Sequence, residues 1–440
     1  MASPAQIPTS QPVSRLHRAF FVLSLLFSFT TIAMRPARAQ TFSVVYSFQA
    51  EGQAGFYPTS GVTVDHGGNL YGTAEYGGPG TSCYLGCGTV FKLTRHGSSW
   101  TLAPLYDFLG NDDGGNPNAR VVIGPNGTLF GTTTQGGGSG CMGLGCGTVF
   151  NLQPPQHAVG NLIHTWPETV LYRFQGGNDG AMPEAGDLAF DQADNIYGTT
   201  DAGGDSQNCQ GGCGTVYKLT HSNGNWTESI LHVFGQAGDG DEPFSGVIFD
   251  QTGNLYGATA SDGAHQQGSV FELIRSGVGW TERLLYSFTG GSDGSYPFYG
   301  LVFDPAGDLY GTTCCNGSDG AGTVFELTAG AWAFNLVYSF GAPGAGQGPE
   351  GSMIMDSAGN LYGTASGGGA YGFGAAFKLS PGNGGWTYTS LHDFCAGGYP
   401  PCSDGYTPTG SLAFDSEGNL YGTTSNGGQY GGGVVYEIAP

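Results

Sequence analysis

The sequence predicts an all-β fold, a seven-bladed β-propeller of four-stranded blades whose last blade is closed by the N-terminal strand. Three observations predict it. One block recurs seven times, at spacings of 52 to 67 residues, and repeats of this length are typical of propellers. Each block divides into four short strand-like segments. The seventh block lacks its fourth segment, and a matching one stands near the N-terminus.

The clearest part of the block is the word Gly-Asn-Leu-Tyr-Gly-Thr and its looser copies. The repeats are centred on the aromatic residues Tyr71, Phe130, Tyr197, Tyr256, Tyr310, Tyr362 and Tyr421. The chain has 83 Gly in 440 residues but no Gly-X-Y period, which excludes collagen. It also has 23 Tyr, 27 Phe and 6 Trp, more aromatic surface than a disordered chain carries.

One block illustrates the four predicted strands. An apolar run at 300–304 leads into a turn that Asp304 opens and Gly307 closes, as a type I turn with a bulge prefers. The second strand is expected at 308–312, the third at 322–327 and the fourth at 332–340. Aromatic and β-branched residues between Gly-rich turns indicate strands. The runs are apolar on both faces, which favours sheets packed between other sheets.

The fourth segment carries every Trp of the chain. Each Trp precedes a Tyr or His by six residues, and this even spacing predicts that both lie on one face of the strand, in the core between blades. The pairs are Trp100/Tyr106, Trp166/Tyr172, Trp226/His232, Trp280/Tyr286, Trp332/Tyr338 and Trp386/His392.

The ends of the chain predict ring closure. The seventh block ends with its third strand at 433–438, and Val45–Phe48 supplies the missing fourth. A ring closed in this way leaves no exposed sheet edge. We therefore expect residues 40–440 to form one propeller domain without a linker or second domain.

The first 39 residues have the layout of a secretory signal peptide. Arg15 and Arg18 precede an apolar run from Ala19 to Phe29, and small residues flank the expected cleavage after Ala39. The alternative, a membrane anchor, needs about 20 apolar residues, more than this run has. No later stretch is apolar enough to span a bilayer. We expect a secreted or periplasmic protein, with no membrane span in the mature chain.

Ten Cys form five pairs that are close in the sequence. With a signal peptide, such pairing predicts disulfides in an oxidising compartment, whose expected role is to pin loops. The rival interpretation is a four-thiolate zinc site. For the adjacent Cys314 and Cys315 the sequence leaves two alternatives, a disulfide that closes a strained ring or two free thiols. The pairs are Cys83/Cys87, Cys141/Cys146, Cys209/Cys213, Cys314/Cys315 and Cys395/Cys402.

The charge balance excludes one class of partner. Removing the four Arg of residues 1–39 changes the formal charge from −22 to −26. Nucleic-acid binding needs a basic face, so we expect no nucleic-acid partner. We expect the protein to be a monomer. Its few basic side chains offer an anionic substrate few partners.

The connections after the second and fourth strands open on one face, which we call the long-loop face. They hold all ten Cys, the Asp-Gly words and nearby aromatic residues. Loops on a rigid scaffold usually carry binding sites. The candidate ligand-binding residues are Tyr57, Asp113, Asp179, Asp239, Asp241, Asp293, Tyr296, Asp404 and Tyr406.

Three interpretations of these Asp compete. Asp-Gly is ordinary turn chemistry, especially with Pro three residues later. Calcium binding through oxygen ligands is the second, and Asp239-Gly240-Asp241-Glu242 is the densest cluster. The third is a catalytic acid pair. We expect no cofactor, with calcium as the alternative.

The Asn-Leu-Tyr-Gly-Thr-Thr word, the Gly-Thr-Val-Phe strand and the Leu-Tyr-x-Phe strand resemble the GloVer (Gloeo_Verruco) tandem repeat of exported bacterial proteins. The resemblance covers nearly all of residues 40–440. It implies an exported β-propeller-like protein, often with a C-terminal surface anchor, although Pro440 here follows directly on a strand. No catalytic residue is carried over by the resemblance.

The sequence has no Gly-x-Ser-x-Gly elbow, no phosphate-binding Gly-Lys-Ser loop and no metal-ligand spacing of His. We therefore predict a non-catalytic protein that binds an extracellular glycan or protein on the long-loop face. The alternative is a secreted hydrolase or lyase that uses loop carboxylates at the central channel, with or without calcium. A purely structural envelope component is a third interpretation.

Overall fold

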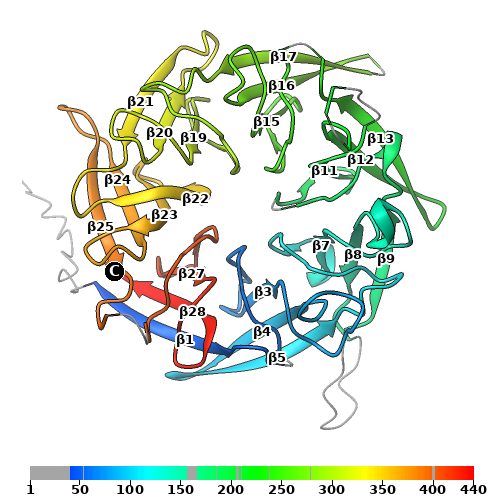
Figure 1. Cartoon of the computed structure of the whole chain (residues 1–440), viewed down its shortest axis with the longest axis horizontal. Helices are drawn as coiled ribbons and strands as arrows, with labels where there is room; N and C mark the ends of the chain where they lie inside the picture. The colour runs from blue at the N-terminus through cyan, green and yellow to red at the C-terminus, as the bar shows by residue number, and fades with distance from the viewer. Residues whose placement is uncertain are drawn as a thin grey trace, which may run out of the picture. The chain divides into compact units, whose positions relative to one another are not determined.

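A computed structural model describes residues 40–440, except 53, 156–165, 185, 205–207, 210, 237, 278 and 399–401. The predicted signal peptide therefore lies outside the described residues. The described part forms seven antiparallel sheets of four strands each, arranged around a central axis. This confirms the predicted seven-bladed β-propeller. Figure 1 shows the fourth strands of the blades at the rim and the second strands nearer the centre.

Each blade runs outward from its first strand. The first strands are β2 (Val62–Val64), β6 (Val122–Ile123), β10 (Ala189–Phe190), β14 (Ile248–Phe249), β18 (Val302–Phe303), β22 (Gly346–Met355) and β26 (Ala413–Phe414). The second strands are β3 (Leu70–Ala74), β7 (Leu129–Thr133), β11 (Ile196–Thr200), β15 (Leu255–Thr259), β19 (Leu309–Thr313), β23 (Leu361–Gly368) and β27 (Leu420–Thr424).

The outer half of each blade is a hairpin in blades 1 to 6. The third strands are β4 (Thr89–His96), β8 (Thr148–Leu152), β12 (Thr215–Ser222), β16 (Ser269–Ser276), β20 (Thr323–Leu327), β24 (Ala375–Ser380) and β28 (Gly431–Ala439). The fourth strands are β5 (Ser99–Asp107), β9 (Glu168–Arg173), β13 (Asn225–Val233), β17 (Gly279–Ser287), β21 (Phe334–Ser339), β25 (Thr387–Asp393) and, for blade 7, β1 (Thr41–Gln49).

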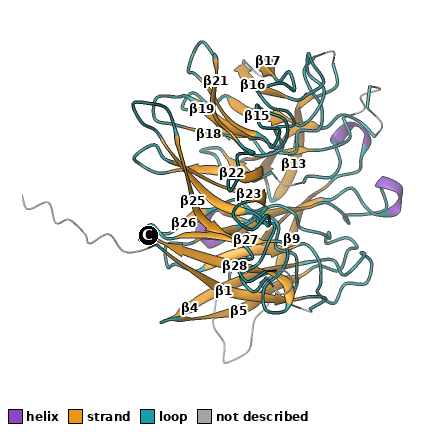
Figure 2. Cartoon of the chain, turned by 60° about the vertical axis from the view of Figure 1, so that its left-hand side comes forward, coloured by secondary structure: helices purple, strands orange, loops and turns teal. Residues whose placement is uncertain are grey.

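Short helical turns occur only in connections among the described residues. They are the 3-10 segments η1 (Pro125–Gly127), η2 (Cys141–Gly143) and η3 (Gly177–Asp179), and Figure 2 draws helical segments in purple among the loops. Within the described part of the chain, no helix is long and apolar enough to cross a membrane.

The N-terminal strand closes the ring as predicted. β1 pairs antiparallel with β28, from Thr41 opposite Ala439 to Gln49 opposite Gly431. Phe48 of β1 is fully buried and lies 5.2 Å, centroid to centroid, from Phe91 of blade 1. The last blade is thus built from both ends of the described chain, and its closing strand also packs on the first blade.

The hydrophobic core lies between the blades. One cluster joins Val90 and Phe108 of blade 1 to Phe150 and Leu152 of blade 2, all of them buried, and similar clusters fill the other seams. The third-strand aromatic ring lies under the Gly of the second strand. A Cβ added to Gly72 would stand 2.6 Å from Phe91 Cζ, so this repeated Gly makes room for the ring.

The prediction that each Trp shares a face with the following Tyr or His is wrong. In blade 1, Trp100 pairs with Arg95 and Tyr106 pairs with Val90, five residues apart on β4. A bulge between them inserts one extra residue, which reverses the parity of the strand. The same register shift recurs in every blade. Trp100 therefore faces Tyr421 of blade 7, whereas Tyr106 faces the seam with blade 2.

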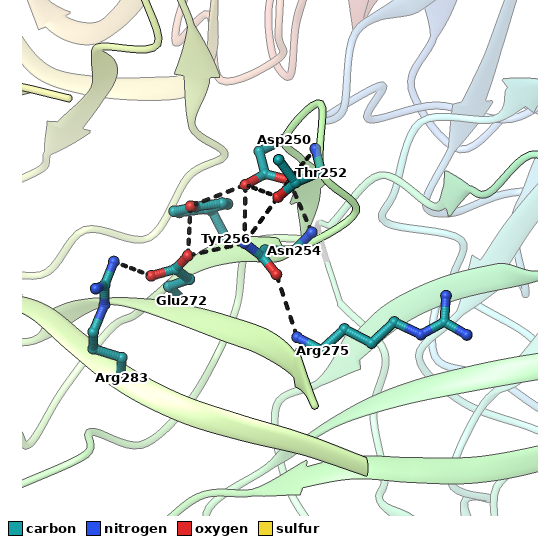
Figure 3. A network of polar contacts seen from close by, with 7 residues as sticks. All are labelled: Asp250, Thr252, Asn254, Tyr256, Glu272, Arg275 and Arg283. Atoms are coloured by element: carbon teal, nitrogen blue, oxygen red, sulfur yellow. Dashed lines mark hydrogen bonds and ion pairs between the residues drawn. The ribbon is translucent and has the colours of Figure 1, made fainter. Parts of the chain in front are cut away.

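The turn between the first and second strands has the predicted form. Asp250 Oδ1 accepts hydrogen bonds from the backbone N–H groups of Thr252 (2.8 Å) and Asn254 (2.9 Å), and Tyr256 Oη donates to Glu272 at 2.7 Å. Figure 3 shows this network, with Arg283 completing it on Glu272. We call the end of the propeller that carries these turns the short-turn face.

Candidate ligand-binding site at the central channel

Five of the predicted site residues lie in the connections between blades and bind their own loop. Asp293 Oδ2, for example, accepts hydrogen bonds from Tyr286 Oη at 3.0 Å and from the Thr289 N–H at 2.8 Å. Three equivalent carboxylates each hydrogen-bond to a fourth-strand Tyr or His and to a loop N–H in the same way; they are Asp113, Asp179 and Asp404. Asp239 accepts a hydrogen bond from the Gly235 N–H at 3.2 Å and lies 3.3 Å from His232 Nε2. These side chains perform the turn chemistry that was one of their three interpretations.

The other four predicted residues are dispersed around the long-loop face. Asp241 accepts a hydrogen bond from Ser261 Oγ. The three Tyr rings each have an aromatic neighbour, 5.6 to 6.0 Å away between centroids, in the pairs Tyr57/Tyr76, Tyr296/Phe298 and Tyr406/Phe373. None of the nine predicted residues lines the central cavity described below.

All five predicted Cys pairs are disulfides. The adjacent Cys314 and Cys315, for which the sequence left a disulfide and two free thiols open, are bonded to each other. The bonds are Cys83–Cys87, Cys141–Cys146, Cys209–Cys213, Cys314–Cys315 and Cys395–Cys402. Every Cys lies in a connection or at its edge, as the sequence predicts.

Five of these ten Cys have side chains that are buried in the protein. Cys87 and Cys146 are 0% exposed and Cys402 is 2% exposed, and Cys213 and Cys395 are also 0% exposed. These five residues are structural and are not available to a ligand.

The packing of the disulfides explains this burial. Cys87 belongs to the core cluster of Val90 and Phe108 at the seam between blades 1 and 2, and Cys146 lies in the equivalent cluster at the next seam. Thiol-derived sulfur behaves as a small apolar group, so it packs well there. A Cβ added to Gly110 would stand 2.4 Å from the sulfurs of both Cys83 and Cys87. The disulfides thus pin the loops onto the seams.

Among the described residues, one group of three potential metal ligands is close enough to share an ion: Cys209, Cys213 and Asp241. The two sulfurs are bonded to each other, and zinc needs thiolates. This group therefore does not support the zinc alternative.

A ring of prolines positions the entry to each first strand. The residue before each Pro has a left-handed φ: Tyr57, Asn116, Met182, Glu242, Tyr296, Gly348 and Thr407. For a non-Gly residue this conformation costs roughly 1–2 kcal/mol. Hydrogen bonds from neighbouring segments hold it in place. The Tyr296 N–H donates to Gln267 O of the preceding blade at 2.9 Å, and its carbonyl accepts from the Cys314 N–H at 3.2 Å.

Each Pro also packs on a Gly of the preceding blade. A Cβ added to Gly268 would lie 2.4 Å from Pro297 Cδ, and the φ of Gly268 is +89°. The same contact joins Gly and Pro at all seven seams. This explains the Gly in the repeated Gly-Thr-Val-Phe word. The residue that follows each Pro is thereby fixed at an equivalent position around the axis.

The residues after the prolines form a ring at the mouth of the channel. They are Thr59, Asn118, Glu184, Phe244, Phe298, Glu350 and Thr409. All except Glu184 line a cavity of about 300 Å³, together with Glu75 and Tyr299. Ring members therefore come from all seven blades, and they differ in chemistry although the scaffold beneath them repeats.

One side of the ring is a chain of hydrogen bonds that we call the polar arc (Thr409, Thr59, Asn118 and Glu184). Thr409 Oγ1 donates to Thr59 O at 3.0 Å, and Thr59 Oγ1 donates to Asn118 Oδ1 at 2.7 Å. The Asn118 side chain in turn hydrogen-bonds to Glu184. The polar arc thus links four consecutive blades, from blade 7 to blade 3.

The other side is the aromatic arc (Phe244, Phe298, Tyr299 and Glu350). The rings of Phe244 and Phe298 meet edge to face, with centroids 5.5 Å apart and planes at 79°. Such pairs are favourable beyond the area that they bury. Tyr299 hydrogen-bonds to Glu350 and is partly buried. The cavity therefore has an apolar wall opposite a hydrogen-bonding wall.

Hydrogen bonds between blades close the cavity beneath these walls. The Gly300 N–H donates to Ser352 Oγ at 3.0 Å, and the Ser352 N–H donates to Ser411 Oγ at 2.8 Å. The Ser411 N–H reaches Ser60 O at 3.3 Å. Because Ser60, Ser352 and Ser411 also line the cavity, these bonds form its floor across blades 5, 6, 7 and 1.

The carboxyl groups at the mouth hold protons more tightly than in water. Burial raises the pKa of Glu184 to about 7, and the nearby Glu75 carboxylate adds to the rise. Burial, followed by the charges of Glu184 and Glu242, raises the pKa of Asp201 to about 7. Burial also raises the pKa values of Glu75 and Glu350. Shifted carboxyls beside a cavity are typical of functional sites.

This ring was not predicted from the sequence. The Asp-Gly words attracted attention because they repeat, whereas the ring residues share no residue type. A signal was present: aligning the seven prolines and reading the next residue gives Thr, Asn, Glu, Phe, Phe, Glu and Thr. Positions that vary on a repeated scaffold would have indicated the site.

Three comparisons relate the chain to known proteins. The model of the Gloeobacter/Verrucomicrobia repeat matches residues 26–208, 145–344 and 281–440. No protein of curated function matches the sequence. Among solved structures, a fungal alcohol oxidase of the AA5 family in complex with copper is 13% identical, with a TM-score of 0.54, over 92% of this chain and 77% of that one.

A second similar structure is the extracellular domain of a protein assigned as a one-component system from B. thetaiotaomicron. It is 11% identical, with a TM-score of 0.50, over 90% of this chain and 39% of that one. A gluconolactonase from Xanthomonas campestris is 13% identical, with a TM-score of 0.38, over 71% and 81% of the two chains. At these identities the likeness concerns the fold alone.

Proposed function

The chain belongs to the Gloeobacter/Verrucomicrobia repeat family, and we propose that it is a secreted, non-catalytic protein that binds a terminal sugar unit of an extracellular glycan in the central cavity. The observation that carries the proposal is the pairing of the aromatic arc with the polar arc across one cavity. The five disulfides are compatible with an extracellular protein.

The two walls match the two surfaces of a sugar ring. A pyranose has C–H groups on its faces, which pack on aromatic rings, and hydroxyls around its edge. Phe244 and Phe298 supply the rings, and Thr59 and Asn118 supply donors and acceptors on the opposite wall. Ligand sites combine an apolar lining with a few placed polar groups in this way.

The size of the cavity limits what it holds. About 300 Å³ is at the lower end of the range for ligand sites. This volume suits one ring at the end of a chain, with the rest of the glycan leaving through the long-loop face.

Binding to a glycan array, followed by calorimetry on the best oligosaccharide, tests this proposal. Replacing Phe298 by Ala removes one aromatic face, and we expect the affinity to fall about tenfold, or about 1.4 kcal/mol. The control is Tyr371→Ala, because Tyr371 is half-exposed and does not line the cavity. Absence of binding to every glycan, or equal loss in both variants, would contradict the proposal.

One observation favours a second candidate, a hydrolase or lyase acting at the mouth of the channel. Glu184 and Asp201, with pKa values of about 7, are partly protonated at neutral pH, as a general acid must be. Release of products from polysaccharides or lactones, abolished in Glu184→Gln, would establish it. The same assays with and without a chelator test the calcium alternative. Flat progress curves throughout would exclude both.

A further inference from the structure

We propose that the sugar unit held in the central cavity carries a protonated amine, as a hexosamine with a free amino group does. This inference rests on the saccharide site proposed above and specifies its substrate class. It follows from the charges around the cavity, from the absence of compensating charges among the described residues there and from the aromatic lining.

Carboxyl groups converge on the mouth from several blades. Glu75 and Glu350 line the cavity on blades 1 and 6. Glu184 interacts electrostatically with Glu75, and Asp201 interacts with Glu184, Asp241 and Glu242. These carboxylates repel one another, so the mouth attracts a cation and disfavours uronic acids and phosphorylated sugars.

No described basic residue balances these charges at the cavity. Its lining includes no Lys, Arg or His. Arg120 stands two residues after Asn118, but its guanidinium forms an ion pair with Asp187 of the next blade. The described Lys side chains lie over Tyr rings of the second strands instead; these pairs are Lys92/Tyr71, Lys218/Tyr197 and Lys378/Tyr362.

Other Arg residues are also engaged elsewhere. Arg95 and Arg283 pair with Glu437 and Glu272, which belong to third strands. Arg173 donates to the carbonyl of Asp112 in a connection between blades. The carboxyls at the mouth therefore have two ways to lower their mutual repulsion, either by taking up protons or by binding a cation from solution.

Two features of the site suit an organic ammonium. The lining includes Glu75 and Glu350, whose carboxyl oxygens are acceptors for the N–H donors of a ligand. An ammonium group also interacts favourably with the faces of aromatic rings such as Phe244 and Phe298. An N-acetylated sugar offers neither the charge nor the extra donors.

The test compares three oligosaccharides of equal length by calorimetry on the full mature chain: oligomers of glucosamine, of N-acetylglucosamine and of glucose. At pH 7 we expect the glucosamine oligomer to bind at least about tenfold more tightly than the other two. Glu184→Gln and Glu350→Gln are each expected to reduce this preference. Glu417→Gln is the control, because Glu417 is exposed on the short-turn face.

The expected pH dependence has a definite sign. A bound cation favours ionised carboxylates, so the preference should grow as the pH rises from 5 to 7. It should disappear at alkaline pH, where the amine loses its proton. The titratable and charged groups around the mouth are Glu75, Glu184, Asp201, Asp241, Glu242 and Glu350, with the Arg120–Asp187 pair beside them.

The outcomes separate the two proposals. If all three oligomers bind equally and Phe298→Ala weakens them all, the amine inference is wrong while the saccharide site stands. If none binds, the proposed function itself is wrong. A rise in melting temperature caused by Ca²⁺ alone, and lost in Glu184→Gln, would overturn the amine inference in favour of a metal ion. The inference is supported only if the glucosamine oligomer binds more tightly than the other two and this preference falls in Glu184→Gln and Glu350→Gln.

Discussion

The two ends of the inner strands contrast sharply. At the short-turn face the same carboxylate recurs in six blades: Asp65, Asp191, Asp250, Asp304, Asp356 and Asp415. At the channel mouth, the residue after each Pro changes from blade to blade, from Thr or Asn to Glu or Phe. The repeated end stabilises the scaffold, and the variable end provides the candidate site.

The electrostatics of the two ends differ as well. Partial burial acts to raise the pKa of Asp356, but hydrogen bonds from Asn360, Tyr362 and Ala358 outweigh it, and the pKa is lowered. At the mouth burial prevails, and the pKa of Glu184 is raised to about 7. The short-turn carboxylates are thus satisfied within the protein, whereas the mouth carboxyls are left to take up protons or to bind an external partner.

The largest expected effect comes from removing the closing strand. Deleting residues 40–49 leaves one edge of β28 unpaired and removes the fully buried Phe48. We expect the mature protein to lose cooperative folding, because the last blade opens and exposes a sheet edge. Thermal melting followed by circular dichroism measures this, and an unchanged transition would refute the closure.

The second-largest effect is expected from substituting a glycine at a seam between blades. In Gly268→Ala the new Cβ would meet Pro297 Cδ at 2.4 Å, in a backbone with φ +89°. Strain and overpacking together predict a loss of about 3 kcal/mol in the free energy of unfolding. Gly253→Ala is the matched control, with φ +90° and nothing within 4 Å. Urea titrations compare the two, and equal losses would show that the Pro contact does not matter.

Two substitutions in blade 6 compare the faces directly. Asp356→Ala removes an acceptor for the N–H groups of Ala358 and Asn360 and for Tyr362 Oη, so we expect a loss of about 2 kcal/mol. Glu350→Gln at the mouth should leave stability unchanged or raise it at pH 7, because it removes a buried ionisable group. Equal destabilisation by both would contradict the division into scaffold and site.

The smallest effect is the dependence of stability on pH. The folded protein holds protons on Glu184 and Asp201 up to about pH 7, above the ordinary values of 4.5 and 3.8. Stability from these groups is therefore present at low pH and is lost as the pH rises through 7. The lowered pKa of Asp356 acts oppositely, with stability lost on acidification below 3.8.

We thus expect the melting temperature to be highest near about pH 5 and to decline toward pH 8. The decline should be shallower in Glu184→Gln, which removes one of the titrating groups. Melting curves at a series of pH values provide the measurement. A melting temperature that rises from pH 5 to pH 8 in the wild-type chain would contradict the raised pKa values.

Much of the scaffold was predictable because its signals are local or periodic. The repeated words indicated the strands, Val45–Phe48 indicated the closing strand, and spacing indicated the Cys pairs. The burial of Cys87 was not predictable, because it depends on the seam with blade 2. Nor was the bulge, because its extra residue, Leu105 in blade 1, resembles any other strand residue. Because of this bulge, Trp100 and Tyr106 lie on opposite faces of the strand and not on the same face as predicted.

The site was harder to predict because its contacts join distant segments. Thr59 and Asn118 are 59 residues apart in the chain, and only the ring brings them to 2.7 Å between their side-chain oxygens. Asp293 and its equivalents suit both turns and ligands, and sequence alone did not distinguish these roles. Burial, which shifts the pKa of Glu184, also depends on the assembled blades.

A crystal structure of the mature protein soaked with a glucosamine dimer tests the central claim most directly. We predict that one sugar ring occupies the central cavity, with its C–H face on Phe298 and its amino group directed to Glu75 or Glu350. Density for the sugar on the Asp-Gly connections around Asp293, with the cavity unchanged, would contradict the claim that the variable ring at the channel mouth is the binding site.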